Sequence, residues 1–149
     1  VIFSKIGASV STAGEVLASM EAARPYAVFL CFGLNDMDLY GDKVDRFIKD
    51  YAACVKTLHE KVPFADVYIC ALSPVTEEAV QKTPAYKNIA LYNREMKKMC
   101  EKTDAVFLDP SFILESRPDL FDQDGIHPKK AFYPRFLTFL ADMAGLENE

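Results

Sequence analysis

The sequence predicts an α/β fold in which helices cover both faces of a parallel β-sheet. Apolar segments of strand length alternate along the chain with longer amphipathic segments of helical period. The apolar segments are continuous, as in strands that are buried on both faces. Half of the 149 residues are hydrophobic, which suffices for one sizeable core, and no internal repeat or linker divides the chain. We therefore expect residues 1–149 to form a single doubly wound α/β domain.

Two strands and two helices are predicted in the first half of the chain. Residues 1–3 read as the end of a strand, and residues 11–23 as a helix that closes before an Arg-Pro pair. Residues 26–32 form a continuous buried strand. The following helix is the clearest element and is stopped by Pro63. Its apolar face consists of Val44, Phe47, Ile48, Tyr51, Ala52, Val55 and Leu58.

The second half continues the alternation of strands and helices. Residues 66–72 and residues 105–108 are predicted strands, separated by a helix at about residues 85–102. A helix over residues 131–144 closes the domain. The predicted inward residues of these two helices are Ile89, Met96 and Cys100 in the first, and Phe132, Phe136, Leu140 and Met143 in the second.

Composition argues against several classes of partner and cofactor. The net charge is −5 and no basic block is present, so nucleic acid is not an expected partner. No stretch approaches the ~20 apolar residues that span a bilayer. No Gly-x-Gly-x-x-Gly or Walker loop occurs, which argues against a dinucleotide or ATP. The acidic segment 36–42 superficially suggests a calcium loop, but Phe47 stands where an EF-hand needs glutamate. We expect no cofactor and no metal.

The four cysteines lie in apolar segments without C-x-x-C spacing. This pattern favours buried free thiols over metal ligands or a disulfide framework. Residues 1–5 lack the charged, apolar and small-residue order of a signal peptide. Together these observations slightly favour a cytoplasmic location. The cysteines are Cys31, Cys54, Cys70 and Cys100.

Two short motifs follow predicted strands and carry most of the functional information. Gly33-Leu34-Asn35-Asp36 comes directly after the strand at residues 26–32. Asp124-Gly125-Ile126-His127 lies between the last strand and the last helix. In doubly wound folds, sites collect at the carboxyl ends of the strands. We therefore expect the two motifs to converge at one end of the sheet.

The residue types in these motifs suit acyl transfer. A turn can let Asp124 accept a hydrogen bond from one imidazole nitrogen of His127, which leaves the other nitrogen free to take a proton from a hydroxyl nucleophile. Asn35 offers an amide donor to an oxyanion that develops on an acyl carbonyl. Each motif alone also has a purely structural interpretation: Asn-Asp after a strand as a turn or helix cap, and Asp-x-x-His as a loop turn. Their pairing favours the catalytic interpretation.

Both motifs resemble blocks of the SGNH or GDSL hydrolase family. Gly33-Leu34-Asn35-Asp36 is similar to its Gly-x-Asn-Asp block, and Asp124-Gly125-Ile126-His127 to its Asp-x-x-His block. The resemblance implies a flavodoxin-like three-layer αβα sandwich whose site uses a serine, a glycine, an asparagine and a histidine. It implies that His127 is the base, Asp124 its orienting acid and Asn35 an oxyanion donor. The segment 5–10 resembles the block whose glycine, here Gly7, gives a backbone N–H to the oxyanion.

The chain departs from that family pattern at the nucleophile. None of the seven serines stands in a Gly-Asp-Ser turn. The family's serine follows its first strand, so we expect the nucleophile upstream of Val1 and assign none within this chain. In the strand order 2-1-3-4-5, the missing first strand would leave a gap in the sheet. We expect a missing N-terminal segment or an oligomer contact to cover it.

Two functional hypotheses follow from the motifs and the missing serine. The first is a serine acyl-ester hydrolase of the SGNH type, acting on a small acyl ester or an acetylated carbohydrate. Substrate choice would then depend on the loops at residues 74–84 and 110–123. The alternative is a non-catalytic binding or interaction module of the same fold that has lost the nucleophile.

Overall fold

A computed structural model describes residues 9–146, which contain a parallel three-stranded sheet. The strand order is β1 (Ala27–Leu30), β2 (Asp66–Cys70) and β3 (Val106–Leu108). Ala27 lies opposite Asp66 in the first pair of strands, and Tyr68 lies opposite Val106 in the second. The strand predicted at residues 1–3 lies outside the described residues.

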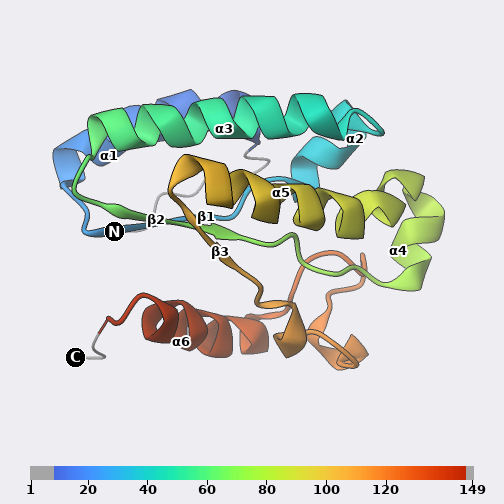
Figure 1. Ribbon diagram of the computed structural model, residues 1–149. Helices are drawn as coiled ribbons and strands as arrows, with labels where there is room; N and C mark the ends of the chain where they lie inside the picture. The colour runs from blue at the N-terminus through green and yellow to red at the C-terminus, as the bar shows by residue number, and fades with distance from the viewer. Residues whose placement is uncertain (1–8, 147–149) are drawn as a thin grey trace.

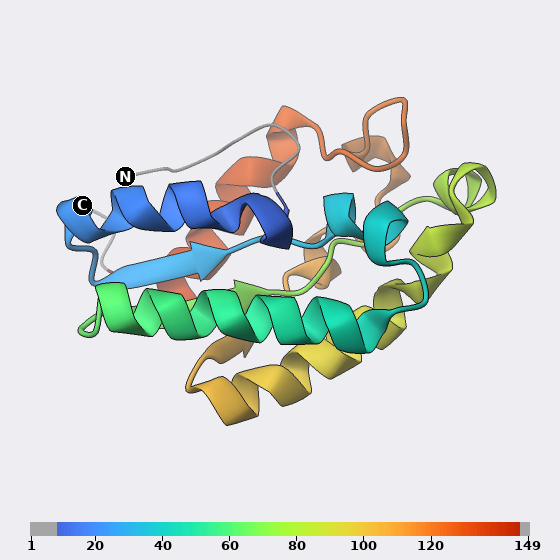
Figure 2. The ribbon, with the colours of Figure 1, turned by 90° about the horizontal axis from the view of Figure 1, so that it is seen from above.

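Helices cover the sheet on both faces (Figure 1). One layer contains α1 (Ala13–Ala23), α3 (Val44–Lys61) and α5 (Ile89–Thr103), which lie side by side when seen from above (Figure 2). The opposite layer contains α6 (Tyr133–Met143). These layers confirm the predicted α/β sandwich. No helix in the described range 9–146 is both long and apolar enough to span a membrane.

Short helices and turns gather at the carboxyl ends of the strands, toward which the strand arrows in Figure 1 point. α2 (Met37–Tyr40) follows β1, and α4 (Glu77–Lys82) follows β2. The 3-10 turns are η1 (Val10–Thr12), η2 (Leu34–Asp36), η3 (Pro84–Asn88), η4 (Ser111–Ile113), η5 (Pro118–Leu120) and η6 (Lys130–Phe132). The loops that are predicted to choose the substrate therefore contain more regular structure than expected.

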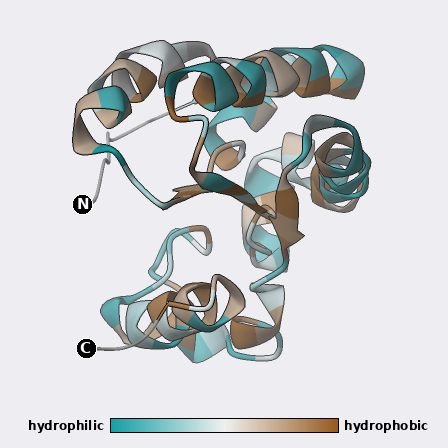
Figure 3. Ribbon diagram, turned by 60° about the vertical axis from the view of Figure 1, so that its left-hand side comes forward, coloured by the Kyte–Doolittle hydropathy of each residue, from teal (hydrophilic) through white to brown (hydrophobic). Residues whose placement is uncertain are grey.

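The larger core lies between the sheet and the layer of α1, α3 and α5. The predicted apolar face of α3 is confirmed, since its inward positions are fully buried at Phe47, Tyr51, Val55 and Leu58. Val28 and Leu30 of β1 project into the same core, whereas Ala27 and Phe29 face α6. The strands thus contribute apolar side chains to both faces. In Figure 3, the ribbon of the strands is coloured mainly as hydrophobic.

The smaller core joins the sheet to α6. Tyr68, Leu108 and Leu140 are buried there, and Tyr68 stacks on Phe29 with ring centroids 4.9 Å apart. The prediction that Met143 points inward is wrong, because its side chain is 52% exposed. Phe136, Phe139 and Leu140 of α6 contact this core, whereas Met143 is the last residue of the helix, and its position at the helix end leaves it exposed.

The cysteines only partly follow the prediction of burial. Cys70 and Cys100 are buried and Cys54 is half-buried, whereas Cys31 is exposed. Cys31 follows Leu30, which points into the larger core, so the alternation of the strand turns Cys31 to the opposite side. The prediction was therefore wrong for this residue.

Candidate active site

Asn35 lies in η2, directly past the carboxyl end of β1. The turn begins at Gly33, whose φ of +126° is open to glycine but strained for other residues. A Cβ at Gly33 would also lie 2.5 Å from Leu72 Cδ2 and 3.1 Å from Phe47 Cζ. The backbone can therefore reverse sharply against the core and present Asn35 at the surface.

Asp36, the next residue, points the other way and is completely buried. The Val10 N–H donates to both of its carboxylate oxygens, over 3.1 Å to Oδ1 and 3.2 Å to Oδ2. Burial raises the pKa of Asp36, while the hydrogen bond from Val10 opposes this shift. Sequence reasoning assigned no role to Asp36, although it stands beside Asn35 in the same motif.

The second motif is held in a tight hairpin between η5 and η6. The Lys129 N–H donates to the Leu120 carbonyl over 2.7 Å, and the Asp122 N–H donates to the His127 carbonyl over 2.8 Å. A further backbone bond of 3.0 Å, from Gly125 to Asp122, closes the turn. This hairpin brings Asp124 and His127 onto one side of the loop.

Asp124 and His127 form a directly bonded acid–base couple. His127 Nδ1 lies 2.5 Å from Asp124 Oδ2. The other carboxylate oxygen, Oδ1, accepts the backbone N–H groups of Ile126 and His127, each over 2.9 Å. Both side chains reach solvent, with 70% of His127 and 43% of Asp124 exposed. The couple is therefore preorganised and accessible.

The protonation state of Asp124 determines which imidazole nitrogen is available. Desolvation opposes ionisation, but the bonds from the His127 side chain and from the backbone of His127 and Ile126 outweigh it and lower the pKa of Asp124 to about 2. An ionised carboxylate only accepts hydrogen bonds, so His127 Nδ1 carries the hydrogen. In the neutral imidazole, Nε2 then keeps a lone pair that can accept a proton.

The hairpin rests on the start of α4. Gly125 has a φ of +68°, and a Cβ there would overlap the Thr76 side chain. The Thr76 N–H donates to the Gly125 carbonyl over 2.9 Å, and Thr76 Oγ1 caps α4 by accepting the Ala79 N–H over 3.3 Å. The sequence predicts a loop over residues 74–84, whereas the structure has the helix α4 there. The pair of glutamates after Thr76, in the first turn of α4, was the sequence feature that could have revealed this helix.

Tyr86 of η3 feels the charge of Asp124 in the second motif and of Asp38 in α2, which follows the first motif. Its burial, and then the carboxylates of Asp38 and Asp124, raise the pKa of its phenol. Asp38 belongs to α2, which follows Asn35, so Tyr86 lies within electrostatic range of both regions. Nothing in the local sequence around Tyr86 indicates this position.

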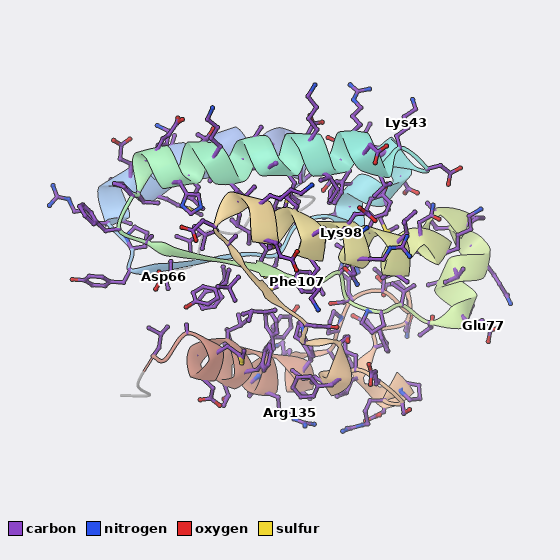
Figure 4. The ribbon with its side chains drawn as sticks, viewed as in Figure 1. Lys43, Asp66, Glu77, Lys98, Phe107 and Arg135 are labelled. Atoms are coloured by element: carbon purple, nitrogen blue, oxygen red, sulfur yellow. The ribbon has the colours of Figure 1, made fainter. Side chains whose placement is uncertain are left out.

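The structure places three of the four predicted site residues at one end of the sheet. Asp124 and His127 are bonded to each other, and Asn35 lies past β1 at the same end; Gly7 lies outside the described residues. In Figure 4 this is the end marked by Glu77, opposite Asp66 at the start of β2. Amide groups in general can donate a hydrogen bond to an acyl oxygen, and a neutral imidazole can accept a proton.

Comparisons with known proteins agree with this fold. The model of the GDSL-like lipase/acylhydrolase family matches residues 2–135. An acetylxylan esterase from Geobacillus stearothermophilus is similar in structure, with 18% identity and a TM-score of 0.69, over 95% of this chain and 69% of that chain.

A second similar structure is a peptidoglycan O-acetylesterase. It shares 13% identity and a TM-score of 0.73 with this chain, over 93% of this chain and 43% of the other. At these identities the likeness concerns the fold. No curated protein matches the sequence.

Proposed function

The chain belongs to the GDSL-like lipase/acylhydrolase family of carboxylic ester hydrolases, and we propose that it provides the acid–base couple and an oxyanion donor of a serine esterase. The observation that carries this proposal is the contact between Asp124 and His127 at the end of the sheet where Asn35 also lies. A structural turn would need only the backbone bonds of Asp124. The further bond to His127 Nδ1 orients the imidazole, which is what a general base requires.

In the proposed reaction, His127 Nε2 takes the proton of a serine hydroxyl while the serine oxygen attacks the acyl carbon. Asp124 remains ionised and stabilises the imidazolium that forms. His127 then returns the proton to the departing alcohol, which leaves an acyl-enzyme. Water, deprotonated by the same nitrogen, releases the carboxylic acid and restores the serine.

The negative charge in the tetrahedral intermediate develops on the former carbonyl oxygen. We propose that the side-chain amide of Asn35 donates a hydrogen bond to this oxygen. The family resemblance assigns a second donor to the backbone N–H of Gly7. Such donors stabilise the transition state more than the bound ester, so they act mainly on kcat.

The proposal takes a serine from outside these 149 residues as the nucleophile. None of the seven serines in the chain stands in a Gly-Asp-Ser turn. We therefore expect the attacking serine upstream of Val1 in the full-length protein.

For the substrate, we propose a small acyl ester or an acetylated carbohydrate, and O-acetylated carbohydrates are the first class to test. Two proteins of similar fold are named as esterases of acetylated xylan and of peptidoglycan O-acetyl groups. The exposed acid–base couple agrees with this proposal, because a bulky polymer can approach side chains that reach solvent.

Labelling the full-length protein with a fluorophosphonate probe tests this function. We expect one covalent adduct, which peptide mass spectrometry places on a serine upstream of Val1, together with release of acetate from acetylated xylan. The matched control is the H127A protein, which should label far more slowly. An adduct on one of the seven serines would contradict the assignment of the nucleophile. The absence of both adduct and hydrolysis would favour the non-catalytic alternative.

A further inference from the structure

Asp36 is completely buried, and it is the one carboxylate with no exposed surface among the side chains whose burial the structure describes. Removing a carboxylate from water is costly unless strong partners replace the lost hydration. No lysine, arginine or histidine in the described range forms an ion pair with it. A buried carboxylate lowers stability unless its contacts compensate for the lost hydration, so the partners of Asp36 bear on its role.

The contacts of Asp36 join two segments that are distant in the sequence. Both carboxylate oxygens accept the N–H of Val10, the first residue of η1, across a separation of 26 residues. The Val10 carbonyl lies 3.5 Å from Cys54 Sγ on α3, which donates to it. Both the N–H and the carbonyl of Val10 are therefore hydrogen-bonded.

Two adjacent side chains of the 3-10 turn η2 point in opposite directions. Asn35 is exposed at the end of the sheet, while Asp36 points inward to Val10. Asp36 bonds Val10, and Val10 stands three residues after Gly7 in the sequence. One short turn thus carries a side-chain donor and also holds the start of η1.

We propose that Asp36 is a positioning residue that keeps the Asn35 turn and the segment after Gly7 at a set separation. This inference rests on the proposed esterase function. Oxyanion donors must lie about 2.7–3.1 Å from the developing charge, and a displacement of about 1 Å can cost about 10²-fold in rate. A buried carboxylate that accepts one N–H with both oxygens restricts that displacement, and it touches no substrate itself.

Kinetics of the D36N variant in the full-length protein test this role. Asparagine keeps the shape, but one oxygen becomes an NH₂ group that cannot accept the Val10 N–H. We expect kcat on p-nitrophenyl acetate to fall by roughly 10–100-fold, with KM changed by less than about 3-fold. The matched control is Y92F, which removes another buried bond, from the Tyr92 hydroxyl to the Gly41 carbonyl over 2.6 Å. Its kcat should stay within about 2-fold of the unsubstituted protein.

A double-mutant cycle with N35A separates positioning from general stability. If Asp36 acts through Asn35, D36N should cost much less in the N35A background than in the unsubstituted protein. Equal costs in the two backgrounds would show that Asp36 only supports the fold and would overturn the inference. An unchanged kcat in folded D36N protein would also overturn it.

A backbone variant keeps the inference testable if D36N does not fold. V10P removes the N–H that Asp36 accepts, and proline suits this position because Val10 is the first residue of η1 and Ser9 before it is extended. V10A keeps the N–H and serves as its control. V10P should lower kcat by roughly 10–100-fold and V10A by much less. Equal losses would contradict the inference, and an unsubstituted protein without esterase activity would overturn both it and the proposed function.

Discussion

The two histidines of the chain lie at opposite ends of the sheet and differ in their partners. His59, in the last turn of α3, is half-buried, and its Nε2 lies 2.9 Å from the Thr103 carbonyl near the end of α5. His127 is exposed and its Nδ1 meets a carboxylate. A carbonyl only accepts a hydrogen bond, so His59 Nε2 must carry the hydrogen.

This difference shows that the hydrogen-bond partner of a histidine says more about whether its free nitrogen can accept a proton than a groove beside it does. A groove of about 670 Å³ lies beside His59, between α3 and α5. Yet the nitrogen of His59 that faces α5 is engaged by Thr103, whose carbonyl belongs to the unsatisfied last turn of that helix. His127 instead has an oriented ring and an available Nε2, although the loop around it is exposed.

The largest expected difference in activity is between the H127A and H59A variants. In the full-length protein, H127A should lower kcat/KM on p-nitrophenyl acetate by about 10⁴-fold, because the proton acceptor is lost. H59A should leave kcat/KM within about 2-fold and lower the free energy of unfolding by about 1 kcal/mol, measured by urea denaturation. A larger activity loss in H59A than in H127A would reverse the comparison.

The N35A variant should have the next largest effect. Removing one oxyanion donor typically costs about 10²–10³ in kcat, with little change in KM. Steady-state kinetics on the same ester measures both constants. A variant that raises KM while kcat stays normal would assign Asn35 to substrate binding instead.

Replacing Gly125 and Gly14 by alanine tests whether the hairpin around His127 depends on its contact with Thr76. G125A combines a φ of +68° with overlap on Thr76, so we expect a loss of about 2 kcal/mol or more in stability and a lower kcat. G14A is the matched control, because Gly14 in α1 has open space around its Cα and should gain about 0.5–1 kcal/mol. Thermal unfolding of both variants decides this, and equal shifts would mean that Thr76 does not support the hairpin.

The smallest effect is the acid dependence of stability from Asp124. Its pKa is about 2 in the folded protein and 3.8 ordinarily, so its contribution is present above about pH 4 and is lost as the pH falls toward 2. The stability difference between the unsubstituted protein and D124N should therefore shrink between pH 5 and pH 2 in urea titrations. Because Asp124 is half-exposed, the change should be small. A difference that grows with acidity would contradict the assigned charge.

Local patterns in the sequence predicted much of the fold and part of the site. The apolar face of α3 follows directly from spacing within one helix. The contact of Asp124 with His127 spans three residues in one turn, so the motif itself contains the geometry. α4 was missed because its six residues are too few to show a clear helical period. The exposure of Cys31 and Met143 depends on where the neighbouring layers end, which the local sequence does not show.

By itself, the sequence determined the alternation of strands and helices, the family blocks and the pairing of an acid with a histidine. These features arise from contacts between residues close along the chain, so periodicity and motifs record them. Only the tertiary structure decided that Asp36 holds Val10, that Thr76 supports Gly125 and that His59 bonds α5. Such contacts join residues 26 to 49 positions apart, where packing of separate elements, rather than local propensity, chooses the partners.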